Sequence, residues 1–183
     1  MGLDLKNIIA ECKKENPKAQ KQLYNYYSPL FFAISLRYMK NQEEAEDVLI
    51  ESFYQIFSKI DTYKNEGSFE GWMKRIVVNK ALMQLRKKNV LNLSVELNSI
   101  KEEGYNEDIV GKLEYKELLE MISELPPGYK TVFNLYIIEG YKHREIAEIL
   151  GVSINTSKSQ LILAKKKLRE IYKKKQSIKN VKS

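Results

Sequence analysis

The chain has 183 residues, of which 43% are hydrophobic and 30% are charged. This length and composition fit one ordinary domain or two small ones, and they exclude a fibrous or wholly disordered protein. An excess of 31 Lys and Arg over 24 Asp and Glu gives a net charge of +7, which favours a polyanionic partner.

The cysteine and histidine content excludes several kinds of site. Cys12 is the only cysteine, so the chain forms neither an internal disulfide nor a cysteine-rich zinc site. His143 is the only histidine, which excludes multi-histidine metal sites. Chemistry by carboxylates alone stays open, but no P-loop and no Gly-x-Gly-x-x-Gly stretch occurs. We therefore expect no catalysis, no cofactor and no metal centre.

Neither a signal peptide nor a membrane-spanning segment is expected. The N-terminus lacks a basic region followed by an apolar run and a small-residue cleavage site. No stretch approaches the roughly 18 uninterrupted apolar residues that a membrane-spanning helix needs. Together with the single cysteine, these features predict a cytoplasmic protein without membrane insertion.

The predicted elements are helices almost throughout, because apolar residues recur at helical spacing and no long run alternates with period two. Asn16 before Pro17 marks one helix start. Asn41, with Glu44 three residues later, marks another, and Ser68 a third. The sequence thus predicts an all-α protein. The expected helices are 17–39, 41–59, 68–88, 112–124, 130–138, 143–150 and 154–175, with a turn-prone segment at 61–67, a break at Pro126-Pro127, and helix ends at Gly140 and Gly151.

Charge divides the chain into three parts. Residues 1–88 carry +4, residues 89–111 carry −4 and residues 112–183 carry +7. In 89–111 the helical periodicity also fades, and no apolar cluster is dense enough to form a core. The sequence therefore predicts two basic helical domains, 1–88 and 112–183, joined by a flexible acidic linker.

The helix expected at 41–59 has two distinct faces when it is projected at about 100° per residue. Its inner face carries Ala45, Val48, Leu49, Ser52, Phe53, Ile56 and Ile60. The opposite face carries Asp47, Ile50, Glu51 and Tyr54. Apolar side chains among carboxylates on an outward face are a reasonable docking surface for a protein, although single exposed apolar residues are common on any surface.

Residues 143–161 have the layout of a helix-turn-helix motif. A short helix that buries Ile146, Ala147 and Leu150 turns at Gly151, and Ser153 caps a second helix. The inner stripe of that second helix comprises Ser157, Leu161, Ala164, Leu168 and Ile171. Its outward face carries Asn155, Lys158, Ser159, Ile162 and Lys165, which suits a DNA major groove. The alternative is a helical hairpin with a solvated basic face.

Four C-terminal segments resemble sigma region 4 of the extracytoplasmic-function (ECF) sigma factors. They are 125–133, 139–140, 145–153 and 156–161. The resemblance implies that this domain binds the minus-35 promoter element with its second helix in the groove. The residues it implicates in minus-35 binding are Asn155, Thr156, Lys158, Ser159, Gln160, Ile162, Leu163 and Lys165.

The chain departs from that family at three positions. A polar or aromatic residue and an arginine are usual where Ile162 and Leu163 stand, and a serine or threonine often stands at Lys142. Exposed aliphatic side chains can contact the thymine methyl group, which predicts a preference for A·T pairs at the positions that Ile162 and Leu163 meet. The alternative is that Ile162 packs against the preceding helices and supports the fold. Lys158, Lys165 and Lys166 are expected to hold phosphates.

The helix at 41–59 is similar to sigma region 2.2. This resemblance implies that Asp47, Ile50, Glu51 and Tyr54 bind core RNA polymerase, at the clamp helices of its largest subunit. Asp47 and Glu51 match the family pattern. Ile50 replaces the usual glutamine, so the contact there must be apolar or absent.

Residues 68–88 resemble sigma regions 2.3 and 2.4, which melt and bind the minus-10 element. That chemistry needs cations along the DNA backbone and a pocket for a base that leaves the stack. The implicated residues are Tyr63, Lys74, Arg75, Asn79, Lys80, Arg86 and Lys87. The loop 62–67, with Tyr63, is the candidate wall of the base pocket. For Phe69 and Trp72, core packing is the favoured alternative, and for Arg75 an internal ion pair is an equal one.

The resemblance spans residues 11–172 and implies a transcription initiation factor that directs core RNA polymerase to promoters. Its expected partners are core polymerase, promoter DNA and an anti-sigma factor. A free-standing helix-turn-helix regulator is the main alternative. It would need a ligand pocket or a self-complementary apolar face in its N-terminal body.

Overall fold

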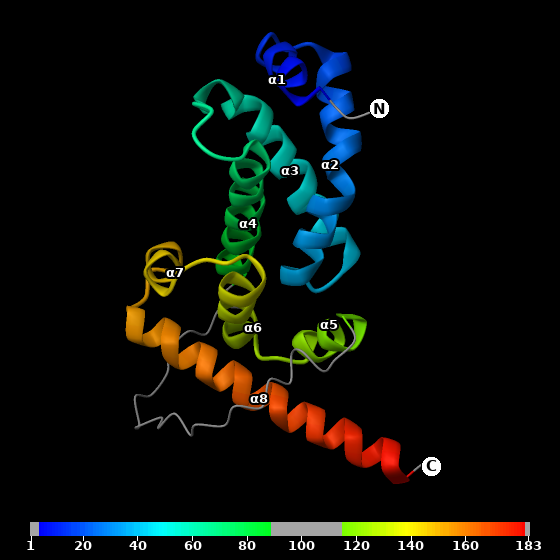
Figure 1. The fold of residues 1–183 in the computed structure, drawn as a ribbon, viewed down its shortest axis with the longest axis vertical. Coiled ribbons are helices and arrows are strands. Elements are labelled where there is room, and N and C mark those ends of the chain that lie inside the picture. Colours follow the sequence, from blue (N-terminus) through cyan, green and yellow to red (C-terminus); the bar gives the residue numbers. More distant parts are fainter. Residues whose placement is uncertain (1–3, 89–114, 182–183) are drawn as a thin grey trace. The chain divides into compact units, whose positions relative to one another are not determined.

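Figure 1 shows a computed structural model of the chain, which describes residues 4–88 and 115–181. The chain forms two compact units, Met1–Lys88 and Asn89–Ser183, which we call unit 1 and unit 2. Every regular element in the described ranges is a helix, so the prediction of an all-α protein with two helical domains is confirmed. The predicted acidic linker, 89–111, lies outside the described residues.

Unit 1 contains four α-helices and one short 3₁₀ turn in its described part. They are α1 (Leu5–Lys13), α2 (Pro17–Tyr38), α3 (Gln42–Lys59), the 3₁₀ turn η1 (Ile60–Thr62) and α4 (Phe69–Lys87). Side-chain oxygens cap three of the helices as predicted. Asn16 accepts a hydrogen bond from the backbone N–H of Lys18 at 3.0 Å, and Asn41 accepts one from Glu44 at 2.9 Å. Ser68 accepts from the N–H of Gly71 at 3.3 Å.

Helix α1 has no counterpart among the predicted elements. It has nine residues, and Ile8 and Cys12 are its buried side chains, so its apolar pattern is too short to indicate a helix. Isolated helices of this length are marginal in water. Packing against α2 therefore stabilises α1. Burial raises the pKa of the Cys12 thiol, and the side chain packs as a small buried apolar group.

The core of unit 1 lies between α2, α3 and α4. Phe31 of α2 and Phe53 of α3 are buried with their ring centroids 5.7 Å apart. All seven residues predicted for the inner face of the 41–59 segment are buried. That periodicity therefore correctly separated the core side of α3 from its solvent side.

Unit 2 contains four α-helices and one π-helical turn in its described part. They are α5 (Tyr115–Ser123), α6 (Pro127–Phe133), the π-helical turn η3 (Asn134–Ile138), α7 (His143–Leu150) and α8 (Ile154–Val181). The helix expected at 130–138 begins earlier, because Pro127 is favoured in the first helical turn. Helix α8 also continues six residues beyond the expected end at 175.

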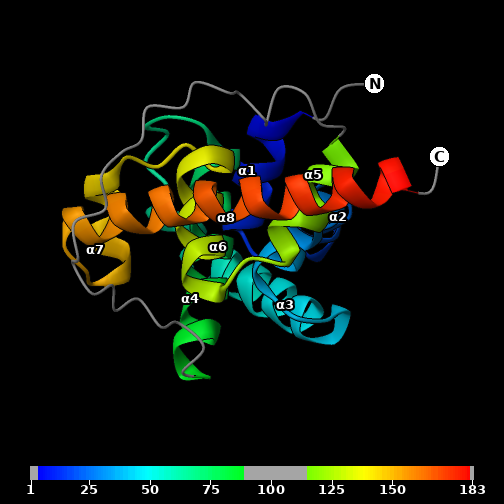
Figure 2. The ribbon, with the colours of Figure 1, turned by 90° about the horizontal axis from the view of Figure 1, so that it is seen from below.

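Helix α8 organises the packing of unit 2. It packs against α5, α6 and α7, and Figure 2 shows α7 beside its first turns. The Nζ of Lys175 lies 2.9 Å from a carboxylate oxygen of Glu124, which ties the later part of α8 to the segment after α5. Both residues are partly exposed, so this pair contributes little to stability. Apolar packing contributes more, and Val132, Phe133 and Ile146 are among the most deeply buried side chains of this core.

The cap at the start of α3 yields a stability prediction. Asn41→Ala removes the oxygen that accepts from the Glu44 N–H, so we expect the unfolding free energy of unit 1 to fall by about 1 kcal/mol. Trp72 is the only tryptophan, so its fluorescence during urea unfolding reports on unit 1. Asn25→Ala, at an exposed position inside α2, is the matched control and should not lower stability. Equal stability of Asn41→Ala and wild type would contradict the prediction.

Candidate nucleic-acid interface

The turn between α7 and α8 has the geometry of a helix-turn-helix motif. Gly151 ends α7 in the left-handed conformation, with φ of 68°, and glycine adopts this conformation without a steric penalty. The N–H of Val152 donates to the carbonyl of Ala147 at 3.0 Å. Ser153 Oγ accepts from the N–H of Thr156 at 2.9 Å and caps α8. The predicted turn and cap are both present.

The start of α7 shows how the chain accommodates Lys142. A lysine ammonium has no lone pair, so it cannot accept a hydrogen bond from the first turn as serine or threonine would. Instead, the carboxylate of Glu145 accepts from the backbone N–H of Lys142 at 2.8 Å. One half of a capping box is therefore retained, and the negative charge of Glu145 lies at the favourable end of the helix dipole.

The faces of α8 largely agree with the predicted minus-35 surface. All five residues of the inner stripe are buried. Among the outward residues, Asn155, Lys158 and Lys165 are exposed, whereas Ser159 and Ile162 are half-buried. Thr156 and Leu163, implicated by the family resemblance, are also half-buried. The structure therefore presents a polar and basic face over the first three turns of α8.

Gln160 does not belong to this face. Its side chain is only 1% exposed, which contradicts the prediction that it binds DNA. Gln160 stands three residues after Ser157 and four before Ala164, so it falls on the inner stripe of the helix. The resemblance placed Gln160 on the DNA side, and the helical spacing alone would have placed it inside.

His143 joins the two helices of the motif. Its Nδ1 lies 2.9 Å from the hydroxyl oxygen of buried Ser157 on α8, and its ring stacks on Tyr136 at a centroid distance of 4.4 Å. Burial lowers the pKa of His143 below its ordinary value, and the positive charges of Lys158 and Lys165 lower it further. The imidazole is therefore neutral at pH 7.

Because His143 is the only histidine, its proton resonances can be assigned directly and its pKa can be measured by NMR. We expect a pKa below 6.5 in the wild-type chain and a higher pKa in Lys158→Gln/Lys165→Gln. Since the folded pKa lies below the unfolded one, unit 2 has its full stability above pH 6.5 and loses some as the pH falls through the lowered pKa. Lys173→Gln/Lys174→Gln is the control, and a pKa unchanged in the first double variant would contradict the electrostatic cause.

The predicted docking face lies on α3 of unit 1. Asp47 and Glu51 are exposed, and Ile50 and Tyr54 keep 61% and 77% of their surface open to solvent. These four residues, which we call the α3 face, lie at helical spacing on one side of α3. Two large apolar side chains exposed side by side on a helix surface are suited to bury area against a partner protein.

The basic residues predicted for minus-10 binding lie along α4. The lysines Lys74 and Lys80 each lie near a carboxylate: Lys74 Nζ is 2.7 Å from Glu70, and Lys80 Nζ is 3.3 Å from Glu51. The second pair links α4 to the α3 face. Both pairs are partly exposed and contribute little to stability, so their lysines can exchange a carboxylate for a phosphate. The other predicted side chains on α4, which are all exposed, are Arg75, Asn79, Arg86 and Lys87.

Tyr63 does not form the wall of an open pocket. Its side chain is 7% exposed, and its ring contacts Phe69 and Trp72 at centroid distances of 4.9 and 5.6 Å. The Tyr63 ring therefore offers no open face to a base in this structure, because neighbouring aromatic rings cover it, and the prediction of a pocket wall is left to the exposed part of the loop. Phe69 is buried as the core interpretation predicted, and Trp72 is half-buried.

One contact near this loop could not be predicted from local patterns. Lys13 Nζ, on α1, donates to the backbone carbonyl oxygen of Tyr63 at 3.4 Å, across 50 residues of sequence. Lysine is common on helix surfaces, and no spacing rule connects a residue of α1 with this loop.

The described residues contain no metal-binding group of three or more His, Cys, Asp or Glu side chains. Within the same ranges, no helix is both long enough and apolar enough to cross a membrane.

Comparisons with known proteins agree with these two units. The family model for sigma-70 region 2 matches residues 23–90, and that for sigma-70 region 4 matches residues 115–168. The sigma factor SigV of Bacillus subtilis is 33% identical over 143 residues, covering 76% of this chain and 82% of SigV. The ECF sigma factor SigW of the same organism is 26% identical over 182 residues, covering 93% of this chain and 97% of SigW.

A solved structure shows the same fold. It is the sigma factor RpoE of Bartonella quintana in complex with the anti-sigma factor NepR, with a TM-score of 0.54 and 21% identity, covering 84% of this chain and 96% of that chain. A helical unit joined to a helix-turn-helix unit with a polar and basic α8 face defines a DNA-binding transcription factor. The chain belongs to the ECF RNA polymerase sigma factors, promoter-specific transcription initiation factors of the sigma-70 family. Members of this family are non-catalytic.

Proposed function

We propose that the two units divide the work of promoter recognition between them. Unit 2 binds the minus-35 element through α8, and unit 1 binds the minus-10 element through α4 and holds core RNA polymerase through the α3 face. The exposed side chains at the start of α8 are the observation that carries this proposal. They stand on a helix that a glycine turn and a serine cap orient for the major groove.

In the minus-35 interface, lysine and amide side chains have different tasks. Exposed Lys158 and Lys165 bind phosphates and set the position of α8 on the duplex. Asn155 and Ser159 supply hydrogen bonds to base edges, whereas half-buried Ile162 and Leu163 supply the apolar contact that favours a thymine methyl group.

In the minus-10 interface, α4 supplies the cations and one amide. Lys74, Lys80 and Lys87 follow the phosphates of the melted strand, and Asn79 offers a paired donor and acceptor to a base. Lys80 releases Glu51 when it binds a phosphate. That release increases the negative charge of the α3 face at the moment when DNA is engaged.

The partners follow from the same surfaces. The α3 face binds the clamp helices of the largest polymerase subunit, and promoter DNA is the polyanion that the net charge of +7 favours. An anti-sigma factor is the proposed inhibitor, supported by the RpoE–NepR complex, in which a related fold is held by one. The chain works without catalysis or cofactor, in the cytoplasm, where polymerase and promoters meet.

Reconstitution with core RNA polymerase tests this function. The complex is supplied with fragmented genomic DNA, and the 5′ ends of its transcripts are sequenced. We expect starts downstream of a shared pair of elements, which neither core polymerase nor the chain alone produces. A regulator without sigma activity would bind DNA alone and leave the starts of core polymerase unchanged, and that result would overturn the proposal.

A further inference from the structure

The loop between η1 and α4 has a defined backbone shape. Asn65 and Gly67 both have positive φ values, of 59° and 82°. A Cβ at Gly67 would meet nothing within 4 Å, so space does not require glycine there. The backbone conformation does, because side chains other than glycine disfavour it. Glycine carries no steric penalty at Gly67, whereas Asn65 pays a cost for its left-handed conformation, which contacts from the surroundings offset.

Tyr63 supplies that support from inside the loop. Its hydroxyl donates to the carbonyl oxygen of Gly67 at 2.9 Å, which bridges the loop from its first residue to its far end. The rings of Phe69 and Trp72, stacked with centroids 5.5 Å apart, hold the Tyr63 ring in place. Tyr63 is thus fixed by α4, and through its hydroxyl it fixes the loop.

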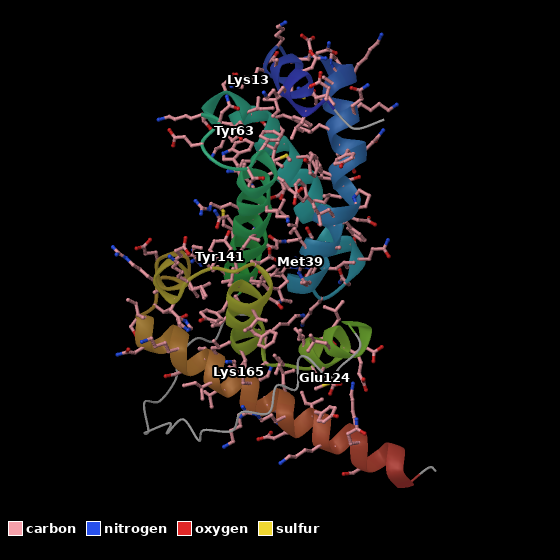
Figure 3. All side chains as sticks on the ribbon, viewed as in Figure 1. Lys13, Met39, Tyr63, Glu124, Tyr141 and Lys165 are labelled. Carbon is pink, nitrogen blue, oxygen red and sulfur yellow. The ribbon has the colours of Figure 1, made fainter. Side chains whose placement is uncertain are left out.

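Helix α1 supports the loop from outside. Lys13 Nζ donates to the Tyr63 carbonyl oxygen at 3.4 Å, and α1 packs against η1. Figure 3 shows Lys13 and Tyr63 at the same end of unit 1. Residues 5–13 precede the segment that matches sigma-70 region 2, which begins at residue 23. This support therefore comes from a part of the chain outside the matched region.

The residues that the loop presents to solvent are polar. Lys64, Asn65, Glu66 and Gly67 are all exposed, and their backbone and amide groups can bind the edge of a base that has left the stack. Such recognition needs donors and acceptors in fixed positions, because a mobile loop would lose entropy on binding.

We propose that Tyr63 is a positioning residue, whose hydroxyl holds residues 64–67 in the shape that receives an unstacked base of the minus-10 element, and that Lys13 reinforces it. This inference rests on the proposed function. It assigns Tyr63 a role without contact to DNA, in agreement with its burial.

Tyr63→Phe is the sharpest test, because it keeps the ring and removes the hydroxyl. The probes are single-stranded minus-10 oligonucleotides, either intact or with an abasic site at one position in turn, bound to the reconstituted holoenzyme. For wild type we expect one position at which the abasic site weakens binding about tenfold or more. For Tyr63→Phe we expect that ratio to shrink about fivefold, the effect of one lost neutral hydrogen bond.

Affinities for core polymerase and for a minus-35 duplex should remain those of wild type, which separates positioning from a general loss of fold. Tyr26→Phe, at an exposed tyrosine of α2, is the matched control. Lys13→Met should reduce the abasic ratio by a smaller factor. If Trp72 fluorescence shows that Tyr63→Phe unfolds, the abasic ratio of Lys13→Met tests the inference in its place, and a ratio equal to that of wild type would overturn it.

An abasic ratio equal to that of wild type in Tyr63→Phe would overturn the inference. So would a wild-type holoenzyme that initiates at promoters but shows no abasic effect at any position. A wild-type complex that initiates nowhere would instead overturn the proposed function, so the two failures are distinguishable.

Discussion

Tyr54→Ala is expected to weaken the binding of the chain to core RNA polymerase by about thirtyfold. Tyr54 is 77% exposed on α3 and stands beside Ile50, which is 61% exposed. A tyrosine at the centre of an interface typically costs about 2 kcal/mol or more when truncated, because its ring buries a large area at a small entropic cost. Nothing in the core of unit 1 is removed by this change.

The measurement is a titration of labelled chain with core polymerase, followed by fluorescence anisotropy. Tyr26→Ala removes another exposed tyrosine, from α2, and should bind as wild type does. Asp47→Arg, on the same face as Tyr54, should also weaken binding because it reverses a charge there. Wild-type affinity in both Tyr54→Ala and Asp47→Arg would show that the α3 face is not the docking surface.

Most of the fold could be predicted from the sequence, because helix caps and helical spacing depend on residues that are close together in the chain. Helix caps at Asn16, Asn41 and Ser68 each depend on a hydrogen bond to a residue two or three positions later, so the sequence contains both partners. The two faces of α3 follow from helical spacing alone. Fold class and the helix-turn-helix therefore needed no information about distant contacts.

The features that the sequence did not predict depend mostly on contacts between residues far apart in the chain. Lys80 pairs with Glu51 across 29 residues, and Lys13 reaches Tyr63 across 50. The π-helical turn at Asn134–Ile138 leaves no mark in the spacing of its apolar residues. The family resemblance assigned Tyr63 to the DNA-binding residues. Its burial results from packing against Phe69 and Trp72, which the resemblance did not indicate.

Gln160 shows the opposite case, in which the spacing was sufficient and the family pattern misled. Its neighbours on the helix wheel, Ser157 and Ala164, were both assigned to the inner stripe, and both are buried. Helical periodicity determines on which side of the helix each side chain lies. A function such as DNA binding, in contrast, belongs to a whole surface and does not require every residue of a family motif to be exposed. At Gln160 the two disagree, and the observed burial follows the periodicity.

Lys158→Gln/Lys165→Gln is expected to reduce the affinity of the holoenzyme for a minus-35 duplex at least about tenfold at low salt. Both lysines are exposed on the outward face of α8, where phosphates of the duplex would lie on either side of the groove. Each lost phosphate contact should also reduce the slope of log affinity against log salt by about 0.9, because fewer counterions are released.

The loss should be nearly uniform across minus-35 sequences, since phosphates carry no sequence information. Lys173→Gln/Lys174→Gln removes the same charge from exposed positions farther along α8 and is the matched control. A titration over a range of salt concentrations separates the outcomes. An unchanged salt slope in Lys158→Gln/Lys165→Gln would place the phosphate contacts elsewhere, whereas a loss confined to one base sequence would mean that these lysines contact base edges. The expected result, a shallower slope with specificity retained, leaves base recognition to the other residues of the outward face of α8, Asn155, Ser159 and Ile162.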